Sequence, residues 1–226
     1  MNFKSAAHLA AFSLAVFLPA AAMAEGETYV GLSLDSDYVI WSQRQNDHSP
    51  ALQGYVEHDF ASGLYAGVWF SQVDYEAFGL DDNAEIDVYL GYRGTAGKLR
   101  YDLSYYMYYY DDYGYDSSDI VAEFAYSLTD KFALGAKINA RQDGVNGGAY
   151  YYGPTAEYVV NETTVIDAAF GDNTLDHRTH WNAGIVHRLG DTVSVEGRYY
   201  DSSSEKGFFT LGIAFDTTLS NLLGKK

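Results

Sequence analysis

The stretch EIDVYLGYR, residues 85–93, alternates between two kinds of side chain. Its even positions carry Ile, Val, Leu and Tyr, whereas its odd positions carry Glu, Asp, Tyr, Gly and Arg. Successive side chains of a β-strand point to opposite faces. This period of two therefore predicts a strand with one apolar face and one mostly polar face.

The same alternation recurs along most of the chain, and helical periodicity is nearly absent. Segments 99–107, 120–128, 132–138 and 209–215 are further examples. Counting all such segments, including the ambiguous 64–73, we predict about twelve strands. An even number of antiparallel strands is what bacterial outer-membrane barrels require.

The connections between these strands alternate between short and long. Tight turns are expected at 61–63, 94–97, 129–131, 161–163 and 190–192. Longer polar loops are expected at 41–50, 74–83, 111–117, 142–148, 171–179 and 202–206. Short turns on one rim and longer loops on the other are typical of the periplasmic and extracellular ends of a barrel.

Alternation alone does not separate a membrane barrel from a soluble β-sandwich, because both need one apolar and one polar face. Three features favour the barrel: the apolar faces carry no charged residue, many of them begin or end in aromatics, and the last strand closes on Phe215. We therefore predict an all-β fold, a transmembrane up-and-down antiparallel barrel of about twelve strands with both termini periplasmic.

The first 24 residues resemble a secretory signal peptide, with basic Lys4, an apolar run over 9–18 and the small-residue triplet 22–24. We expect residues 1–24 to be this leader and residues 25–226 to form the barrel. The net charge of −17 disfavours nucleic acid as a partner. The chain contains no cysteine, which excludes disulfides and thiolate metal sites.

The segment LSYYMYYYDDYGYDSSD, residues 103–119, holds seven tyrosines and four aspartates. It is compatible with a disordered segment, a sugar-stacking surface, or a strand that runs into a wet loop. The barrel frame favours the strand, with Tyr106, Tyr108 and Tyr110 facing inward and the aspartates beginning where the strand leaves the membrane. Tyrosine suits this place because its ring prefers the interface and its hydroxyl finds water.

Several segments resemble the TorF family, described as outer-membrane porins of Gram-negative bacteria. They are Ser36-Asp37-Tyr38, Gln45, PALQG at 50–54, ASGLYAGVW at 61–69, EIDVYLGY at 85–92 and the tyrosine-rich strand. This resemblance covers the first half of the mature chain, and it implies an outer-membrane barrel that acts as a channel. One departure is Trp41-Ser42, which stands where the family usually has an Arg-Gly pair.

Inward-facing charges are the candidate functional residues, as the lining of any solute path. Ladder counting across the turn at Thr129 places Glu123 opposite Lys137 and Asp119 opposite Arg141, and it makes Glu157 face Asp167. Such pairs either hold the barrel shape or form a charged constriction. The candidates are Asp87, Arg93, Arg100, Asp102, Asp119, Glu123, Lys137, Arg141, Glu157, Asp167, Arg188, Glu196 and Arg198.

Two features test this interpretation. Pro154 falls within the predicted strand 149–160 and lacks an amide donor, so we expect a bulge there or a split strand. A lipid-modifying enzyme would need a serine beside a histidine, yet His58 and His187 have no serine in register. His177 and His180 with Asp176 are a weak metal signal. We expect no catalytic residue, no metal and no cofactor.

The sequence thus predicts a passive channel for small cations or neutral solutes across the outer membrane. Its expected partners are outer-membrane lipid, lipopolysaccharide and these solutes. Two alternatives remain: a non-conducting barrel that presents its acidic loops, and the lipid-modifying enzyme. Because a twelve-stranded barrel lies between filled eight-stranded barrels and open porins, we expect a narrow lumen.

Overall fold

The computed structural model describes residues 26–46, 48–75, 79–204 and 206–224. The expected signal peptide, residues 1–24, lies outside the described residues. The elements are β1 Glu27–Asp35, β2 Val39–Ile40, β3 Gln43–Arg44, β4 Ala51–Asp59, β5 Leu64–Gln72, β6 Ala84–Ala96, β7 Leu99–Tyr110, β8 Gly114–Ser127, β9 Phe132–Gly144, β10 Tyr150–Asn161, β11 Thr164–Asn173, β12 His180–Arg188, β13 Val193–Ser202, β14 Phe208–Thr218 and α1 Leu219–Leu222.

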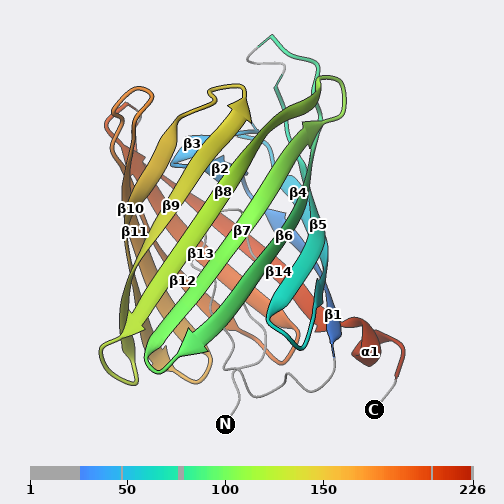
Figure 1. Cartoon of the computed structure of the whole chain (residues 1–226), viewed down its shortest axis with the longest axis vertical. Coiled ribbons are helices and arrows are strands. Elements are labelled where there is room, and N and C mark those ends of the chain that lie inside the picture. Colours follow the sequence, from blue (N-terminus) through green and yellow to red (C-terminus); the bar gives the residue numbers. More distant parts are fainter. Residues whose placement is uncertain (1–25, 47, 76–78, 205, 225–226) are drawn as a thin grey trace.

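Twelve of these strands, β1 and β4 to β14, form one closed antiparallel barrel (Figure 1). Each strand pairs with its chain neighbour, except that β1 passes over the small β2–β3 hairpin to reach β4. The barrel closes where β14 pairs with β1, with Leu32 opposite Phe215. The prediction of a twelve-stranded antiparallel barrel is confirmed, and closure rules out a two-sheet sandwich.

The distribution of polar and apolar side chains is the reverse of that in a soluble protein. Outward residues such as Phe209 and Leu211 are 76% and 69% exposed, whereas inward Glu57 and Arg198 are each 1% exposed. Large apolar residues normally fill a core, and charged residues are rarely buried unless they are paired. An apolar outer belt around a polar interior matches a barrel whose outside faces lipid. Within the described part of the chain, no helix has the length and apolarity to cross a membrane.

The two rims differ as expected. In Figure 1 the short turns lie at the lower rim, together with the start of β1 and the end of β14, and the longer connections lie at the upper rim. One predicted loop, 111–117, is wrong in extent, because β8 already begins at Gly114. The tyrosine-rich strand β7 therefore returns through a turn of only three residues, 111–113.

Pro154 does not split its strand, contrary to our expectation. The register of β10 with β9 is constant through Gly153 and Pro154, which face Lys137 and Ala136. On the other side, the ladder to β11 omits both residues between Tyr152 and Thr155, yet it resumes in the same register. The missing amide is thus accommodated by a local gap in pairing, without a bulge.

Candidate functional site: the barrel interior

One side of the interior is filled by aromatic rings, which we call the tyrosine wall. These rings come from β4 to β7 and pack on one another; Tyr89 stacks on Tyr106 at 4.9 Å between centroids, and Tyr65 meets Tyr89 edge-on at 6.1 Å. The members of the tyrosine wall are Tyr55, Tyr65, Trp69, Tyr89, Tyr106 and Tyr108. Such pairs add about 0.5–1.5 kcal/mol each beyond the area they bury.

Two glycines let these rings lie against the strands. Gly91 pairs with Tyr65 and Gly67 pairs with Tyr89 across the ladder. A Cβ at Gly91 would lie within 2.4 Å of the Tyr65 ring, and a Cβ at Gly67 within 2.5 Å of the Tyr89 hydroxyl oxygen. Each ring therefore covers a bare stretch of its neighbouring strand, which thickens this side of the barrel.

The predicted loop 41–50 is wrong in its placement, because its first part belongs to a hairpin, β2–β3, that folds into the lumen. At its base, Tyr38 packs on Trp69 of the tyrosine wall, with centroids 5.4 Å apart. At its tip, Trp41 stacks on Tyr151 of β10 at 4.9 Å, and the Ser42 hydroxyl donates to the Trp181 carbonyl of β12. The hairpin thus spans the interior from the wall of β5 to that of β10 and β12, and it narrows any path through the barrel.

The turn of this hairpin has an unfavourable backbone. Trp41 and Ser42 have φ angles of 50° and 57°, the left-handed region that two-residue hairpin turns require and that Asn-Gly occupies readily. For residues with a Cβ, the left-handed region costs on the order of 1–3 kcal/mol each. The contacts of Trp41 and Ser42 with β10 and β12 offset this cost and hold the tip in place.

The opposite side of the interior is nearly bare, and we call it the small-residue wall. Its inward positions on β8 to β11 are Ala125, Gly135, Gly153, Thr155, Ala169 and Gly171. A hollow of about 650 Å³, which includes open solvent, lies between this wall and the hairpin tip. Trp41 and Ser42 line its upper side, and His180, Asn182 and Tyr200 extend its lining onto β12 and β13.

Charged residues on β4 to β7 gather around Arg93. Its guanidinium lies 3.0 Å from Glu57, 3.3 Å from Asp102 and 3.9 Å from Asp59. The same group lies 3.6 Å above the Tyr65 ring, whose hydroxyl donates to Asp102. Arg93 and Asp102 were predicted as lumen residues, and the structure brings them together beneath the tyrosine wall.

A second arginine, Arg198, is enclosed on β13. It donates two hydrogen bonds to Asp167 at 2.6 and 2.8 Å, one to Asn182 at 2.6 Å and one to Glu196 at 2.5 Å. A guanidinium presents a planar fork of donors that suits this two-point contact. Gly184 provides the space, because a Cβ there would lie 2.6 Å from the guanidinium carbon.

The like-charged pair Glu157 and Asp167 faces each other across the ladder, as predicted. Each acid has its own arginine: Asp167 binds Arg198, and Glu157 lies 3.2 Å from Arg100. Arg100 belongs to β7, so its side chain passes over β8 and β9 to reach β10. Ala125 and Gly135, which continue the ladder row of Arg100, leave room for this crossing.

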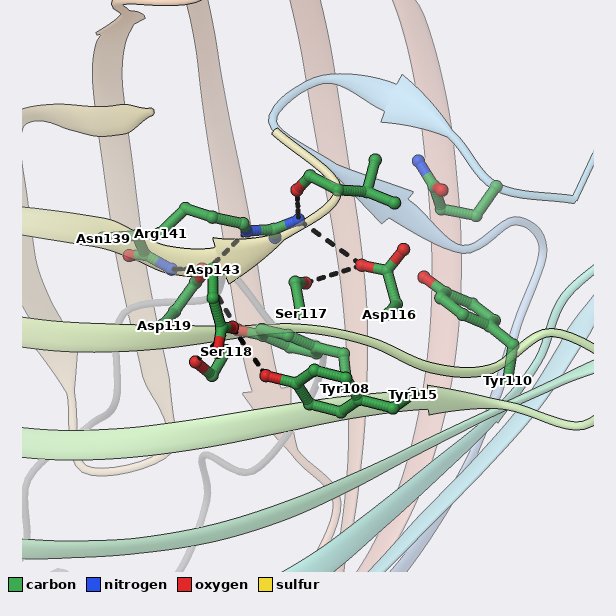
Figure 2. A network of polar contacts seen from close by, with 12 residues as sticks. Tyr108, Tyr110, Tyr115, Asp116, Ser117, Ser118, Asp119, Asn139, Arg141 and Asp143 are labelled. Carbon is green, nitrogen blue, oxygen red and sulfur yellow. Dashed lines mark hydrogen bonds and ion pairs between the residues drawn. The ribbon is translucent and has the colours of Figure 1, made fainter. Parts of the chain in front are cut away.

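A polar network lies at the upper ends of β8 and β9 (Figure 2). The Arg141 guanidinium lies 2.7 Å from Asp119 and 3.5 Å from Asp116, and it donates to the Val145 carbonyl. The ladder shifts register beside Asp119 and again near Asp116. These bulges direct side chains differently from the regular alternation, which explains why Asp116 was placed in a loop.

The remaining candidates occupy three kinds of place. Lys137 lies 2.5 Å from Glu123, as ladder counting predicted. Arg188 is at the lower rim, where it donates to the Glu162 carbonyl. Asp87 is buried with Glu85 two residues away, and no basic side chain among the described residues forms an ion pair with either.

The histidines do not form an enzyme-like pair among the described residues. His58 and His187 face outward at the lower rim, and each shares a hydrogen bond of 2.9 Å with a threonine across the ladder, Thr28 and Thr164. His180, expected in a loop, instead begins β12 and points into the lumen. The described residues contain no group of three histidines or acids that could hold a metal.

Several lining residues were missed by reasoning from charge. Ser42, Thr155 and Asn182 are uncharged, and Trp41 was noted only as a departure from the TorF pattern. The available signal was the pairing of Trp41-Ser42 with a turn position that favours glycine. The glycines and alanines of the small-residue wall left no chemical signal, because they act through the space they leave.

Solved structures with this architecture are porins. A KdgM porin has a TM-score of 0.60 at 8% identity, and the match covers 84% of this chain and 98% of that chain. Another, titled a KdgM porin in complex with disordered oligogalacturonate, has a TM-score of 0.58 at 8% identity over the same shares. A NanC porin has a TM-score of 0.54 at 8% identity, covering 83% and 98%. These likenesses show the fold.

Comparison by sequence points to one family. No curated protein matches the chain. A family model described as "Bacterial protein of unknown function (Gcw_chp)" matches residues 20–223. The chain therefore belongs to the Gcw_chp family of bacterial proteins.

Proposed function

We propose that this protein is a diffusion channel for small cations or uncharged solutes in the outer membrane of a Gram-negative bacterium. The observation that carries the proposal is the hollow along the small-residue wall, inside a closed barrel whose outer belt is apolar. A scaffold barrel needs no such space. The resemblance to TorF porins and the porin folds of KdgM and NanC support the same function.

The charges of the interior favour cations over anions. The five basic side chains Arg93, Arg100, Lys137, Arg141 and Arg198 all lie in ion pairs with acids. Asp35, Glu85 and Asp87 form no ion pair within the described residues, so the lumen has an excess of negative charge. A cleft lined by one sign of charge concentrates the opposite ion and repels its own.

The same excess separates this protein from one structural neighbour. That KdgM structure is titled with oligogalacturonate, an acidic oligosaccharide. A lumen with surplus carboxylates repels such a solute, so we propose a different class of substrate here. Export through the leader at residues 1–24 and cleavage after Ala24 complete the proposal.

Conductance across planar bilayers tests the channel. The mature protein, refolded in detergent and checked for its β-structure by heat-dependent mobility, is added to a bilayer under a gradient of potassium chloride. We expect discrete conductance steps with a reversal potential on the cation side. A reversal potential on the anion side contradicts the selectivity, and silence from folded protein favours a barrel that presents its loops.

A further inference from the structure

The hollow beneath the hairpin tip has the features of a binding site as well as a passage. Its volume of about 650 Å³, open solvent included, lies in the range of small-molecule sites, which span about 300–1,000 Å³. It combines a bare wall of glycine and alanine with a few polar groups that converge from β10 and β12. This combination is typical of pockets that hold a ligand in one orientation.

His180 is the polar group that most needs a partner. It is 3% exposed, and neither ring nitrogen has a hydrogen-bond partner among the described residues. Its ring lies edge-on to Trp41 at 5.0 Å and covers Gly171, where a Cβ would come within 2.5 Å of Nε2. A buried polar atom without a partner costs about 1–3 kcal/mol, and a solute in the hollow is placed to remove that cost.

Two neighbouring side chains add to the polar surface. Asn182 uses its carbonyl oxygen to accept from Arg198, so its amino group remains a donor toward the hollow. Thr155 presents a hydroxyl, which both donates and accepts. Neutral histidine likewise offers one donor and one acceptor. Hydroxyl groups match this mixture, because each of them also donates and accepts.

The charges at the hollow argue for an uncharged solute. Lys137 and Glu123, which line it, lie 2.5 Å apart and neutralise each other. An ionic solute would have to compete with this pair. The apolar surface of the hollow, from Ala125, Ala169 and the edge of Trp41, suits the C–H face of a ring.

The hairpin turn provides an independent reason to regard the hollow as built. Its two central residues accept left-handed backbone angles that Asn-Gly would adopt without strain. Strained residues persist where the surrounding contacts over-determine them, commonly at ligand sites. Here the strain places the Trp41 ring over the hollow and against His180.

We propose that the hollow is a binding site for an uncharged, hydroxyl-rich solute of about monosaccharide size, held by His180, Asn182 and Thr155 beneath Trp41. This inference deepens the proposed channel function, in that it names the class of solute that pauses in the lumen.

A tryptophan fluorescence titration tests the site without relying on conductance. The chain has three tryptophans, so a Trp69→Phe/Trp181→Phe background leaves Trp41 as the reporter. The full mature barrel in detergent is titrated with D-glucose, and with potassium gluconate and glucosamine hydrochloride as charged analogues. We expect a saturable change in Trp41 emission with glucose and a weaker response to both analogues.

His180→Phe keeps a ring against Trp41 but removes both nitrogens, and it should weaken glucose binding about tenfold. Thr210→Val on β14, away from the hollow, is the matched control and should change nothing. If His180→Phe does not fold, Thr155→Val replaces it, with an expected loss of about threefold. An unchanged affinity in the folded variant, an equal response to the charged analogues, or no response to glucose overturns the site.

The two proposals fail separately. Glucose binding by a barrel that gives no conductance steps supports the site and contradicts the channel. Conductance steps from a barrel whose Trp41 emission ignores glucose support the channel and contradict the site.

Discussion

The two sides of the barrel interior use the same strand geometry for opposite purposes. On the tyrosine wall, cross-strand glycines are covered by rings, and the space between the strands and the hairpin base is filled. On the small-residue wall, glycines and alanines remain uncovered and a hollow results. The comparison teaches that strand number alone does not set the width of a barrel. The inward side chains decide which side stays open.

The largest effect is expected where the open side meets its buried charges. Arg198→Met removes the partner of Asp167 and Glu196 and leaves both acids uncompensated in an enclosed site. We expect the free energy of unfolding to fall by about 3–5 kcal/mol, the usual cost of breaking a buried ion pair. Urea unfolding in detergent micelles, followed by heat-dependent mobility, measures it.

Arg188→Met is the control for that experiment. Arg188 lies at the rim and contacts only a turn carbonyl in the hydrogen bonds described above, so its removal should cost no more than about 0.5 kcal/mol. Equal losses in the two variants would contradict the enclosed role of Arg198.

The second prediction compares the walls directly. Tyr89→Ala deletes a buried ring that contacts both Tyr65 and Tyr106, and it should lower the free energy of unfolding by about 3 kcal/mol. Thr155→Ala on the small-residue wall should cost less than about 1 kcal/mol, because its side chain faces open space. The same unfolding assay decides, and similar losses would mean that the two walls do not differ in packing.

The third prediction concerns the charges that border the open side. Arg100→Met leaves Glu157 unpaired and makes the lumen more negative, so cation preference should increase. Glu157→Gln removes an acid instead and should lower it. Each change is expected to alter the permeability ratio by a factor of roughly 2 to 5, since a single partly solvated charge contributes about 0.5–1 kcal/mol. Reversal potentials that move in the same direction for both would refute this assignment.

The smallest effect is expected at the rim beside the tyrosine wall. Backbone amides of Asn83 and Ala84 donate to Asp111 and lower the pKa of its carboxyl group. A lowered pKa in the folded protein means that this contribution is present above the ordinary pKa of about 3.9 and is lost as the pH falls further. Hydrogen exchange at these two amides should accelerate in Asp111→Asn. Asp112→Asn serves as the control, and equal exchange in both variants would count against the anchor.

Alternation in the sequence was sufficient to predict the barrel, and counting across the tight turn at Thr129 predicted the pairs Glu123–Lys137 and Asp119–Arg141. Both follow from local rules, because neighbouring strands share a ladder. Arg100 with Glu157 could not be predicted in this way, since their strands are not neighbours. The inward course of the hairpin depends on long-range contacts of Trp41 and Ser42, and the hollow depends on side chains that are missing, so neither produces a pattern in the sequence.

The most direct test of the difference between the walls uses the absence of native cysteine. A single cysteine is introduced either at Ala169 on the small-residue wall or at Ser104 of β7 behind the tyrosine wall, and single-channel current is recorded while a cationic methanethiosulfonate reagent is added. We predict that current through Ala169→Cys falls on modification, while current through Ser104→Cys is unchanged. Block at Ser104→Cys without block at Ala169→Cys would contradict a path along the small-residue wall.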